Sequence, residues 1–164
     1  MRKLKLYLDT SAISHIDAPD RRDWEAITGE FYRFVKEHPD EFELVASPIT
    51  LFEIDQCPEP KRSSLYDFLS TVDFTILPEN QEALSLADLY AQEGILAKKH
   101  SRDLTHVAYA TVVRCDYVVS WNMKHLVKAR TISGVNLINR MNNYCDIIIM
   151  TPLAFIGEQS YEND

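Results

Sequence analysis

The sequence lacks the features that mark several protein classes. It has three cysteines among 164 residues, Cys57, Cys115 and Cys145, which lie far apart and form no CxxC pair. An odd number of scattered cysteines predicts reduced thiols in a reducing compartment rather than a disulfide framework. No apolar run approaches the ~20 residues that a membrane-spanning helix needs. The first residues, MRKLKLYLD, predict a strand and not a signal peptide, so we expect a cytoplasmic protein without membrane contact.

The sequence also contains fewer basic than acidic residues. The chain has 17 Lys and Arg against 25 Asp and Glu, which gives a formal net charge of −8. Proteins that coat nucleic acid are basic, so this balance argues against that class. It is compatible with an enzyme that touches nucleic acid at one local patch, and an acidic surface suits a basic protein partner.

The sequence contains none of the common catalytic fingerprints GxGxxG, GxxxxGK[ST], GxSxG and HExxH. Any chemistry therefore has to come from residues that the fold brings together from separate segments. No repeat, linker or low-complexity block divides the chain, and its 46% hydrophobic content is ordinary for a globular protein. We expect one domain over residues 1–156, followed by a polar C-terminal tail over residues 157–164.

Strand and helix patterns alternate along the whole chain. Buried strands are predicted at 4–8, 42–46, 74–77, 117–120 and 147–150, with helical patterns between them. This alternation predicts an α/β fold with three layers, α/β/α, around a central and mostly parallel sheet of four to five strands. Local patterns further predict a turn at 12–15, a helical stretch at 123–129, a short helix at 135–141 and an N-cap at Ser101.

Three acidic residues fall where predicted strands end or predicted helices begin. Asp9 directly follows the first strand, Glu53 lies on the helix after the second strand, and Asp103 lies in the first turn of a later helix. The carboxyl ends of parallel strands and the starts of neighbouring helices meet at one edge of a sheet. Several carboxylates in one cleft repel each other unless a hard cation such as Mg²⁺ or Mn²⁺ neutralises them. The pattern therefore favours a metal site.

Each of these acids also has an ordinary structural explanation. Asp9 precedes Thr10 and Ser11 and could cap the next helix. Glu53 interrupts an apolar helix and could form a structural salt bridge, and Asp103 could be a common first-turn acid. One shared site explains all three positions together, which favours the metal-site hypothesis over three separate explanations.

Four segments, taken in order, resemble the PIN domain ribonucleases, a family that includes the toxins of type II toxin–antitoxin pairs. The segments are LDTS at Asp9, SPITLFEI around Glu53, RDLTHVAYA at Asp103 and VVSWNMKHL at the end of the fourth strand. The resemblance spans Leu4 to about Leu153. It implies a PIN-like fold and a Mg²⁺- or Mn²⁺-dependent endoribonuclease, with an antitoxin partner and a homodimer as further expectations.

The resemblance also implies roles for individual residues. Asp9, Glu53 and Asp103 would be the catalytic metal ligands, and Ser11 would support Asp9 through a hydroxyl hydrogen bond. The family often carries a fourth acid at the position of Asn122, where an amide adds no charge. This departure keeps open an alternative function, a catalytically inactive PIN-fold binding module. A HAD-type phosphatase ranks last, because that family needs a second Asp where Ser11 stands.

Several neighbouring residues are candidates for supporting or RNA-binding roles. We expect His106, one turn after Asp103, to support the site rather than bind metal, because a lone histidine is usually a packing or hydrogen-bonding group. Trp121 could stack on an unpaired base, but packing at the rim or in the core is the role that we favour. Asp116 opens the fourth strand and should therefore lie at the opposite edge. Basic residues beside the predicted site that could hold phosphates, or simply be solvated, are Lys98, Lys99, Arg102 and Lys124.

Overall fold

The computed structural model describes residues 1–161. Its strands are β1 (Leu4–Leu8), β2 (Phe42–Ala46), β3 (Phe74–Ile76), β4 (Tyr117–Val119) and β5 (Ile148–Met150). Its helices are α1 (Thr10–Ser14), α2 (Arg22–Glu37), α3 (Pro48–Asp55), α4 (Lys61–Thr71), α5 (Gln81–Gln92), the 3₁₀ helix η1 (Lys98–His100), α6 (Ser101–Val112), α7 (Ala129–Met141) and α8 (Pro152–Tyr161). None of these helices combines the length and the apolar character that crossing a membrane requires.

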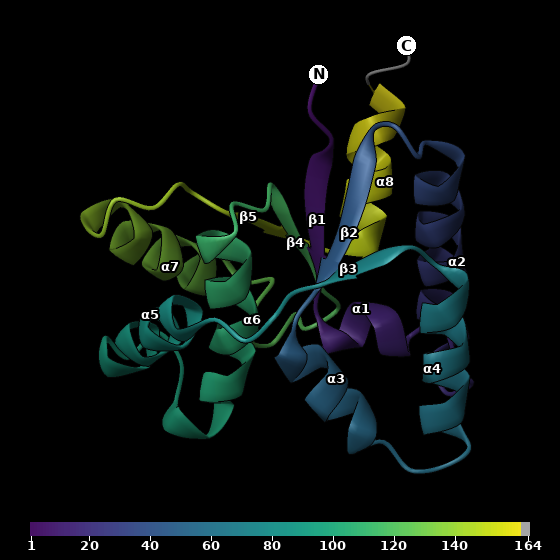
Figure 1. The fold of residues 1–164 in the computed structure, drawn as a ribbon, viewed down its shortest axis with the longest axis horizontal. Coiled ribbons are helices and arrows are strands. Elements are labelled where there is room, and N and C mark those ends of the chain that lie inside the picture. Colours follow the sequence, from purple (N-terminus) through teal and green to yellow (C-terminus); the bar gives the residue numbers. More distant parts are fainter. Residues whose placement is uncertain (162–164) are drawn as a thin grey trace.

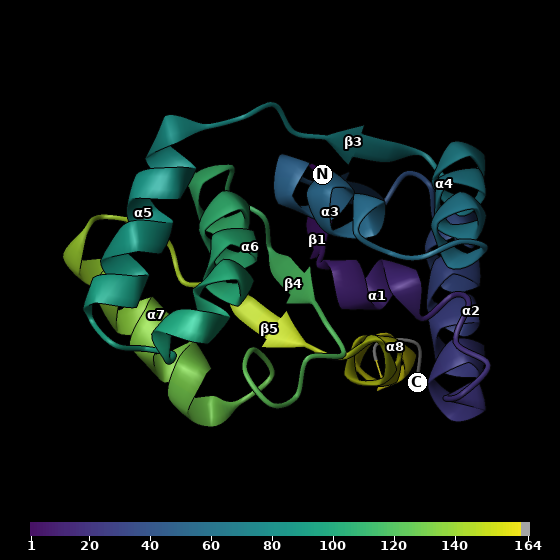
Figure 2. The same cartoon turned by 90° about the horizontal axis from the view of Figure 1, so that it is seen from below.

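The five strands form one parallel sheet in the order β3-β2-β1-β4-β5. Helices cover both faces: α5, α6 and α7 lie on one side, and α2, α4 and α8 lie on the other (Figure 1). The predicted α/β fold with three layers is therefore confirmed, and the sheet is entirely parallel. The short helices α1 and α3 lie between the two helix layers when the molecule is seen from below (Figure 2).

Side chains that point alternately to the two faces of the sheet form two hydrophobic cores, one on each face. In β1, Tyr7 faces the layer of α5, α6 and α7, whereas Leu6 and Leu8 face the opposite layer. In β4, Val118 and Val119 divide in the same way. Side chains on a strand point alternately to its two faces, and a parallel sheet covered on both faces needs apolar residues on both. The continuous apolar runs in the sequence therefore correspond to strands buried on both sides.

Four local predictions differ from the structure. Residues 123–128 form hydrogen-bonded turns instead of a helix, and α7 begins at Ala129, earlier than the predicted helix. Residues 10–14 form helix α1 where a turn was expected. His100, not Ser101, is the N-cap of α6, because η1 leads directly into that helix.

The predicted polar tail is wrong over most of its length. Helix α8 runs from Pro152 to Tyr161 and passes through the predicted boundary at residue 156. Phe155 is fully buried among the residues of β2, β4 and α2, and this contact anchors the helix against the sheet. The remaining part of the predicted tail, residues 162–164, lies outside the described residues.

The strand order places a topological switch beside β1. The chain moves from β1 to β2 on one side and later returns to β4 on the other side, so the connections from the carboxyl ends of β1 and β4 diverge. The crevice outside such a switch is where open α/β sheets bind ligands. Asp9 follows β1 at this point, and Ser120 follows β4 beside it.

Candidate active site at the carboxyl edge of the sheet

Asp9 is buried at the switch point, with 4% of its surface exposed. Its Oδ1 accepts hydrogen bonds from the Ser11 hydroxyl at 2.6 Å and from the Ala12 backbone N–H at 3.0 Å. Its Oδ2 accepts a hydrogen bond from the Ser120 hydroxyl at 2.5 Å. The predicted bond from Ser11 is therefore present, and the bond from Ala12 confirms the alternative prediction that Asp9 caps α1.

The surroundings of Asp9 provide neutral hydrogen-bond donors, and no Lys or Arg of residues 1–161 forms an ion pair with it. Burial raises the pKa of Asp9 above its ordinary value, and the nearby His106 and the three hydrogen bonds offset only part of this effect. A buried carboxyl group with a raised pKa at a ligand-binding edge is a typical property of functional sites.

Glu53 is held by a chain of buried polar groups that begins on β1. Its Oε1 accepts a hydrogen bond from the Thr10 hydroxyl at 2.8 Å and lies 2.5 Å from His106 Nε2. On the other side of the imidazole, His106 Nδ1 lies 2.7 Å from the hydroxyl of Tyr7, which lies 2.6 Å from Ser47 Oγ. The chain ties β1, the start of α3 and α6 together behind the carboxylate.

The direction of the hydrogen bonds in this chain follows from the chemistry of its ends. A carboxylate only accepts, so His106 Nε2 carries the hydrogen of its bond to Glu53, while Nδ1 shares a hydrogen bond with the Tyr7 hydroxyl. Burial raises the pKa of the Tyr7 phenol far above its usual range, so the phenol remains a donor. Burial also acts to raise the pKa of Glu53, but the hydrogen bonds from His106 and Thr10 outweigh it and lower that pKa.

Glu53 therefore presents an ionised and oriented carboxylate to solvent. Its side chain is 24% exposed. Both hydrogen bonds go to Oε1, and Oε2 has no hydrogen-bond partner among the residues that the structure describes. The expectation that His106 supports the site agrees with this position, since its ring nitrogens bind Glu53 and Tyr7.

Asp103 lies in the first turn of α6, three residues before His106 and therefore on the same face of the helix. Its carboxylate meets two imidazoles, those of His100 and His125. One possible ligand atom from each of these three side chains lies within 4.8 Å of the other two, and all three side chains are half-buried. The two imidazole rings stack with their centroids 3.9 Å apart.

The three predicted metal ligands do not converge on one point. In residues 1–161, the trio of His100, Asp103 and His125 is the one group of three or more potential ligand side chains that meets the 4.8 Å distance. Both oxygens of Asp9 already accept hydrogen bonds from the protein. The residues as arranged here do not fit an Mg²⁺ ion coordinated directly by Asp9, Glu53 and Asp103 together.

Asn122, at the predicted fourth corner, initiates a turn. Its Oδ1 accepts a hydrogen bond from the backbone N–H of His125 at 3.1 Å, and its backbone carbonyl accepts from Leu126 and Val127. Its own backbone N–H donates to Ser120 Oγ at 2.9 Å. These bonds form one turn after β4 and commit the side-chain oxygen of Asn122 to it.

Trp121 is not available for RNA stacking, so that prediction is corrected. Its side chain is buried, with 4% of the residue exposed, and its indole stacks on Trp24 at a centroid distance of 4.5 Å and an angle of 10°. The indole N–H donates to Thr28 Oγ1 at 2.9 Å. Trp121 therefore fixes the end of β4 against α2, as the packing alternative predicted.

The predicted phosphate contacts lie beside the histidines of the trio. Lys98 and Lys99 precede His100 in η1, and Lys124 precedes His125. These lysines and Arg102 are exposed. The guanidinium carbon of Arg102 lies 5.1 Å from the ring centroid of Phe52 on α3, so it extends from α6 toward the helix that carries Glu53.

Some residues of the site were not identified from the sequence. Ser120 and Thr10 bind the two carboxylates, and Tyr7 orients His106, yet these residues belong to ordinary strand-end or helix-start patterns. Tyr7 offered one indication, since a buried phenol needs a hydrogen-bond partner inside the fold. His100 and His125 are 25 residues apart, and no local spacing predicts their contact.

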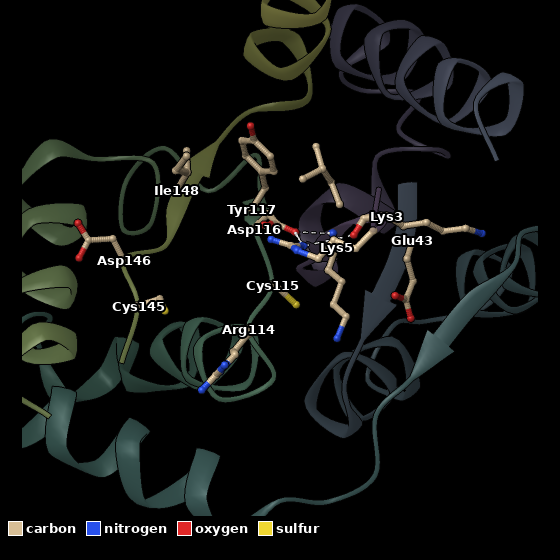
Figure 3. A pocket seen from close by; sticks show the side chains of 12 residues that line it. Lys3, Lys5, Glu43, Arg114, Cys115, Asp116, Tyr117, Cys145, Asp146 and Ile148 are labelled. Carbon is tan, nitrogen blue, oxygen red and sulfur yellow. Dashed lines mark hydrogen bonds and ion pairs between the residues drawn. The ribbon is translucent and has the colours of Figure 1, made fainter. Parts of the chain in front are cut away.

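The opposite edge of the sheet carries a separate pocket of about 840 Å³ (Figure 3). Asp116 lies there, as predicted, and accepts two hydrogen bonds from Arg2 at 2.7 and 2.8 Å. Its Oδ2 also accepts from the backbone N–H of Lys5 at 2.8 Å. Asp116 is therefore fully engaged in a structural ion pair at the far end of the sheet from Asp9.

Comparison with known proteins identifies the fold. No protein-family model matches the chain, and no curated protein sequence matches it. A solved structure, VapBC2 from Rickettsia felis bound to a DNA fragment from the promoter, is similar in structure with a TM-score of 0.55. The match covers 90% of this chain and 98% of that chain, with 11% sequence identity. The fold is therefore PIN-like, in agreement with the sequence resemblance.

Proposed function

We propose that this protein is a divalent-metal-dependent endoribonuclease of the PIN type, with its active site at the carboxyl edge of the sheet. The observation that carries the proposal is Glu53, an ionised and partly exposed carboxylate that His106 and Thr10 hold through Oε1, while Oε2 has no hydrogen-bond partner among residues 1–161. The PIN-like fold supports the assignment, and so does the relationship to a structure named as VapBC2. An antitoxin partner is part of the same proposal.

Different residues of the site would bind and orient different parts of an RNA phosphodiester. Lys98, Lys99, Arg102 and Lys124 are exposed cations that can contact phosphate oxygens. Glu53 Oε2 can accept a hydrogen bond from a water molecule and orient it toward the phosphorus. Glu53, through Oε2, is the residue that would hold a Mg²⁺ or Mn²⁺ ion, and the ion would supply positive charge at the phosphate; coordination by Asp9, Glu53 and Asp103 together is not part of the proposal.

An RNA cleavage assay tests this function. Purified protein should cut single-stranded RNA in the presence of Mn²⁺ or Mg²⁺, and EDTA should abolish the cleavage. The Glu53→Gln variant keeps the size of the side chain and an acceptor for His106, and should reduce the rate by about 100-fold or more. Asp116→Asn at the opposite edge is the matched control and should cut at the parental rate. Equal cleavage by parent and Glu53→Gln would contradict the assignment.

A second candidate, a catalytically inactive binding module with the same fold, is favoured by one group of contacts. Both oxygens of Asp9 accept hydrogen bonds from the protein, and the amide oxygen of Asn122 accepts one from the turn. Polar groups committed in this way stabilise the loops after β1 and β4 without any ligand. RNA binding without cleavage under every metal condition, by both the parent and Glu53→Gln, would support this candidate.

A further inference from the structure

We propose that His100, Asp103 and His125 form a binding site for a transition-metal ion, with Zn²⁺ as the expected ligand. This site shares Asp103 with the three-carboxylate site that the family resemblance implies, but its other two donors, His100 and His125, are not part of that set. The proposal does not depend on the proposed RNA cleavage. The three side chains offer two imidazole nitrogens and one carboxylate within 4.8 Å of one another. Two histidines and one carboxylate are an established ligand set for Zn²⁺, and they leave one coordination position open.

The donors of the trio are not used by other groups. Within the part of the chain that the structure describes, no hydrogen bond or ion pair involves the side chains of His100, Asp103 or His125. The other three histidines differ in this respect. His15 and His38 each place Nδ1 2.7 Å from a backbone carbonyl, and both ring nitrogens of His106 have partners.

The backbone holds the trio from two sides. His100 and Asp103 are three residues apart at the start of α6, so they share one face of that helix. His125 is fixed by the turn, because its N–H donates to Asn122 Oδ1 and its carbonyl accepts from Thr131 Oγ1 at 2.5 Å. In a tetrahedral Zn²⁺ site, ligand atoms ~2.0–2.2 Å from the metal are roughly 3.4 Å apart. Small rotations of half-buried side chains can close this difference.

The donor set of the trio selects for the kind of metal. Two of its three donors are imidazole nitrogens, which suit Zn²⁺, whereas Mg²⁺ prefers oxygen ligands. We therefore expect binding of Zn²⁺ and of its spectroscopic substitute Co²⁺, and no competition from millimolar Mg²⁺.

Calorimetry with ZnCl₂ on tag-free, chelator-treated protein measures the binding directly. The parent should bind one equivalent of Zn²⁺. His100→Ala and His125→Ala should each weaken this binding by more than about 100-fold, beyond the 10–100-fold cost of losing an outer partner of a metal ligand. His38→Ala is the matched control and should bind as the parent does. Circular dichroism of each variant checks that the fold is retained, and Asp103→Asn provides a third variant of nearly unchanged shape.

NMR of the imidazole groups locates the ion without reference to activity. The chain has five histidines, and Zn²⁺ should shift the ring signals of His100 and His125 while those of His15 and His38 remain in place. Shifts confined to His106, shifts at none of the histidines, or unchanged affinity in His100→Ala and His125→Ala would each overturn the proposal. Zn²⁺ binding without RNA cleavage would leave this site standing and refute only the nuclease, and the reverse result would do the opposite.

Discussion

The two edges of the sheet shift the pKa of an aspartate in opposite directions. At the amino edge, Asp116 pairs with Arg2, whose hydrogen bond lowers the pKa of that carboxyl group. At the carboxyl edge, Asp9 is buried among neutral donors, and burial raises its pKa. The ion pair favours the charged form of Asp116, whereas burial disfavours the charged form of Asp9.

The contrast indicates which edge is built for a ligand. A protein that needed only stability would supply a cation to a buried acid or replace the acid with an apolar residue. Among residues 1–161, the carboxyl edge instead leaves Asp9 without an ion pair, Glu53 Oε2 without a hydrogen bond, and the side chains of His100, Asp103 and His125 without a hydrogen bond or ion pair. Groups that lack protein partners at such a position are available to a ligand.

The largest expected loss of stability comes from cutting the polar chain behind Glu53. Tyr7→Phe removes the hydroxyl that joins Ser47 to His106 and leaves the buried His106 Nδ1 without its hydrogen-bond partner. An unsatisfied buried group costs about 1–3 kcal/mol, so the free energy of unfolding in urea should fall by that amount. Tyr66→Phe removes a hydroxyl bonded to Asp55 on the surface and should change stability far less. Equal losses in both variants would show that the chain is not a special feature of the carboxyl edge.

The second prediction concerns a substitution that should increase stability, whereas most substitutions decrease it. In Asp9→Asn, the amide oxygen can accept from Ser11 and Ala12, and the amide nitrogen can donate to Ser120, so every hydrogen bond has a replacement. The variant should be more stable than the parent at pH 7, by about 1 kcal/mol for each unit by which the folded pKa is raised. The measurement is urea unfolding of both proteins between pH 4 and pH 8.

The pH dependence follows from the raised pKa of Asp9. A carboxyl group whose pKa is raised by folding contributes to the free energy of unfolding. This contribution is fully present below the unfolded pKa of about 3.9 and is lost as the pH rises through the folded pKa. The advantage of Asp9→Asn should therefore grow as the pH rises from 4 and then level off. Asp116→Asn should behave oppositely and lose stability at neutral pH, because its folded pKa is lowered. The measured quantity is the stability of Asp9→Asn relative to the parent. If this relative stability were lower at pH 8 than at pH 4, the conclusion that burial of the Asp9 carboxylate is not fully compensated would be refuted.

The fold and part of the site could be predicted because they depend on local patterns. Apolar runs marked the strands, and an acid directly after the first strand had to lie at the carboxyl edge. The remaining features depend on contacts between distant segments. Trp121 is buried against Trp24, and helix α8, which Phe155 packs against the sheet, continues past the predicted boundary. His125 stacks on His100 from a distant segment, and it lies in the turn that Asn122 starts where the pattern predicted a helix.

The smallest expected effect concerns the ion pair at the amino edge. Arg2→Gln removes the charge that pairs with Asp116, while the backbone N–H of Lys5 continues to donate to that carboxylate. Arg2 is 69% exposed, and exposed ion pairs contribute little and are screened by salt. The melting temperature should therefore fall slightly at low ionic strength and match the parent in about 1 M NaCl, where the Debye length is ~3 Å.

A suitable control for this measurement is Arg33→Gln, since Arg33 has no ion pair among residues 1–161. This control should leave the melting temperature unchanged at both salt concentrations. A large decrease in the melting temperature of Arg2→Gln that persists in high salt would mean that Asp116 depends on its ion pair with Arg2, as a buried acid would. The absence of a cation at Asp9 would then be even harder to explain by stability alone, because the same fold would be shown to depend on such a partner at its other edge.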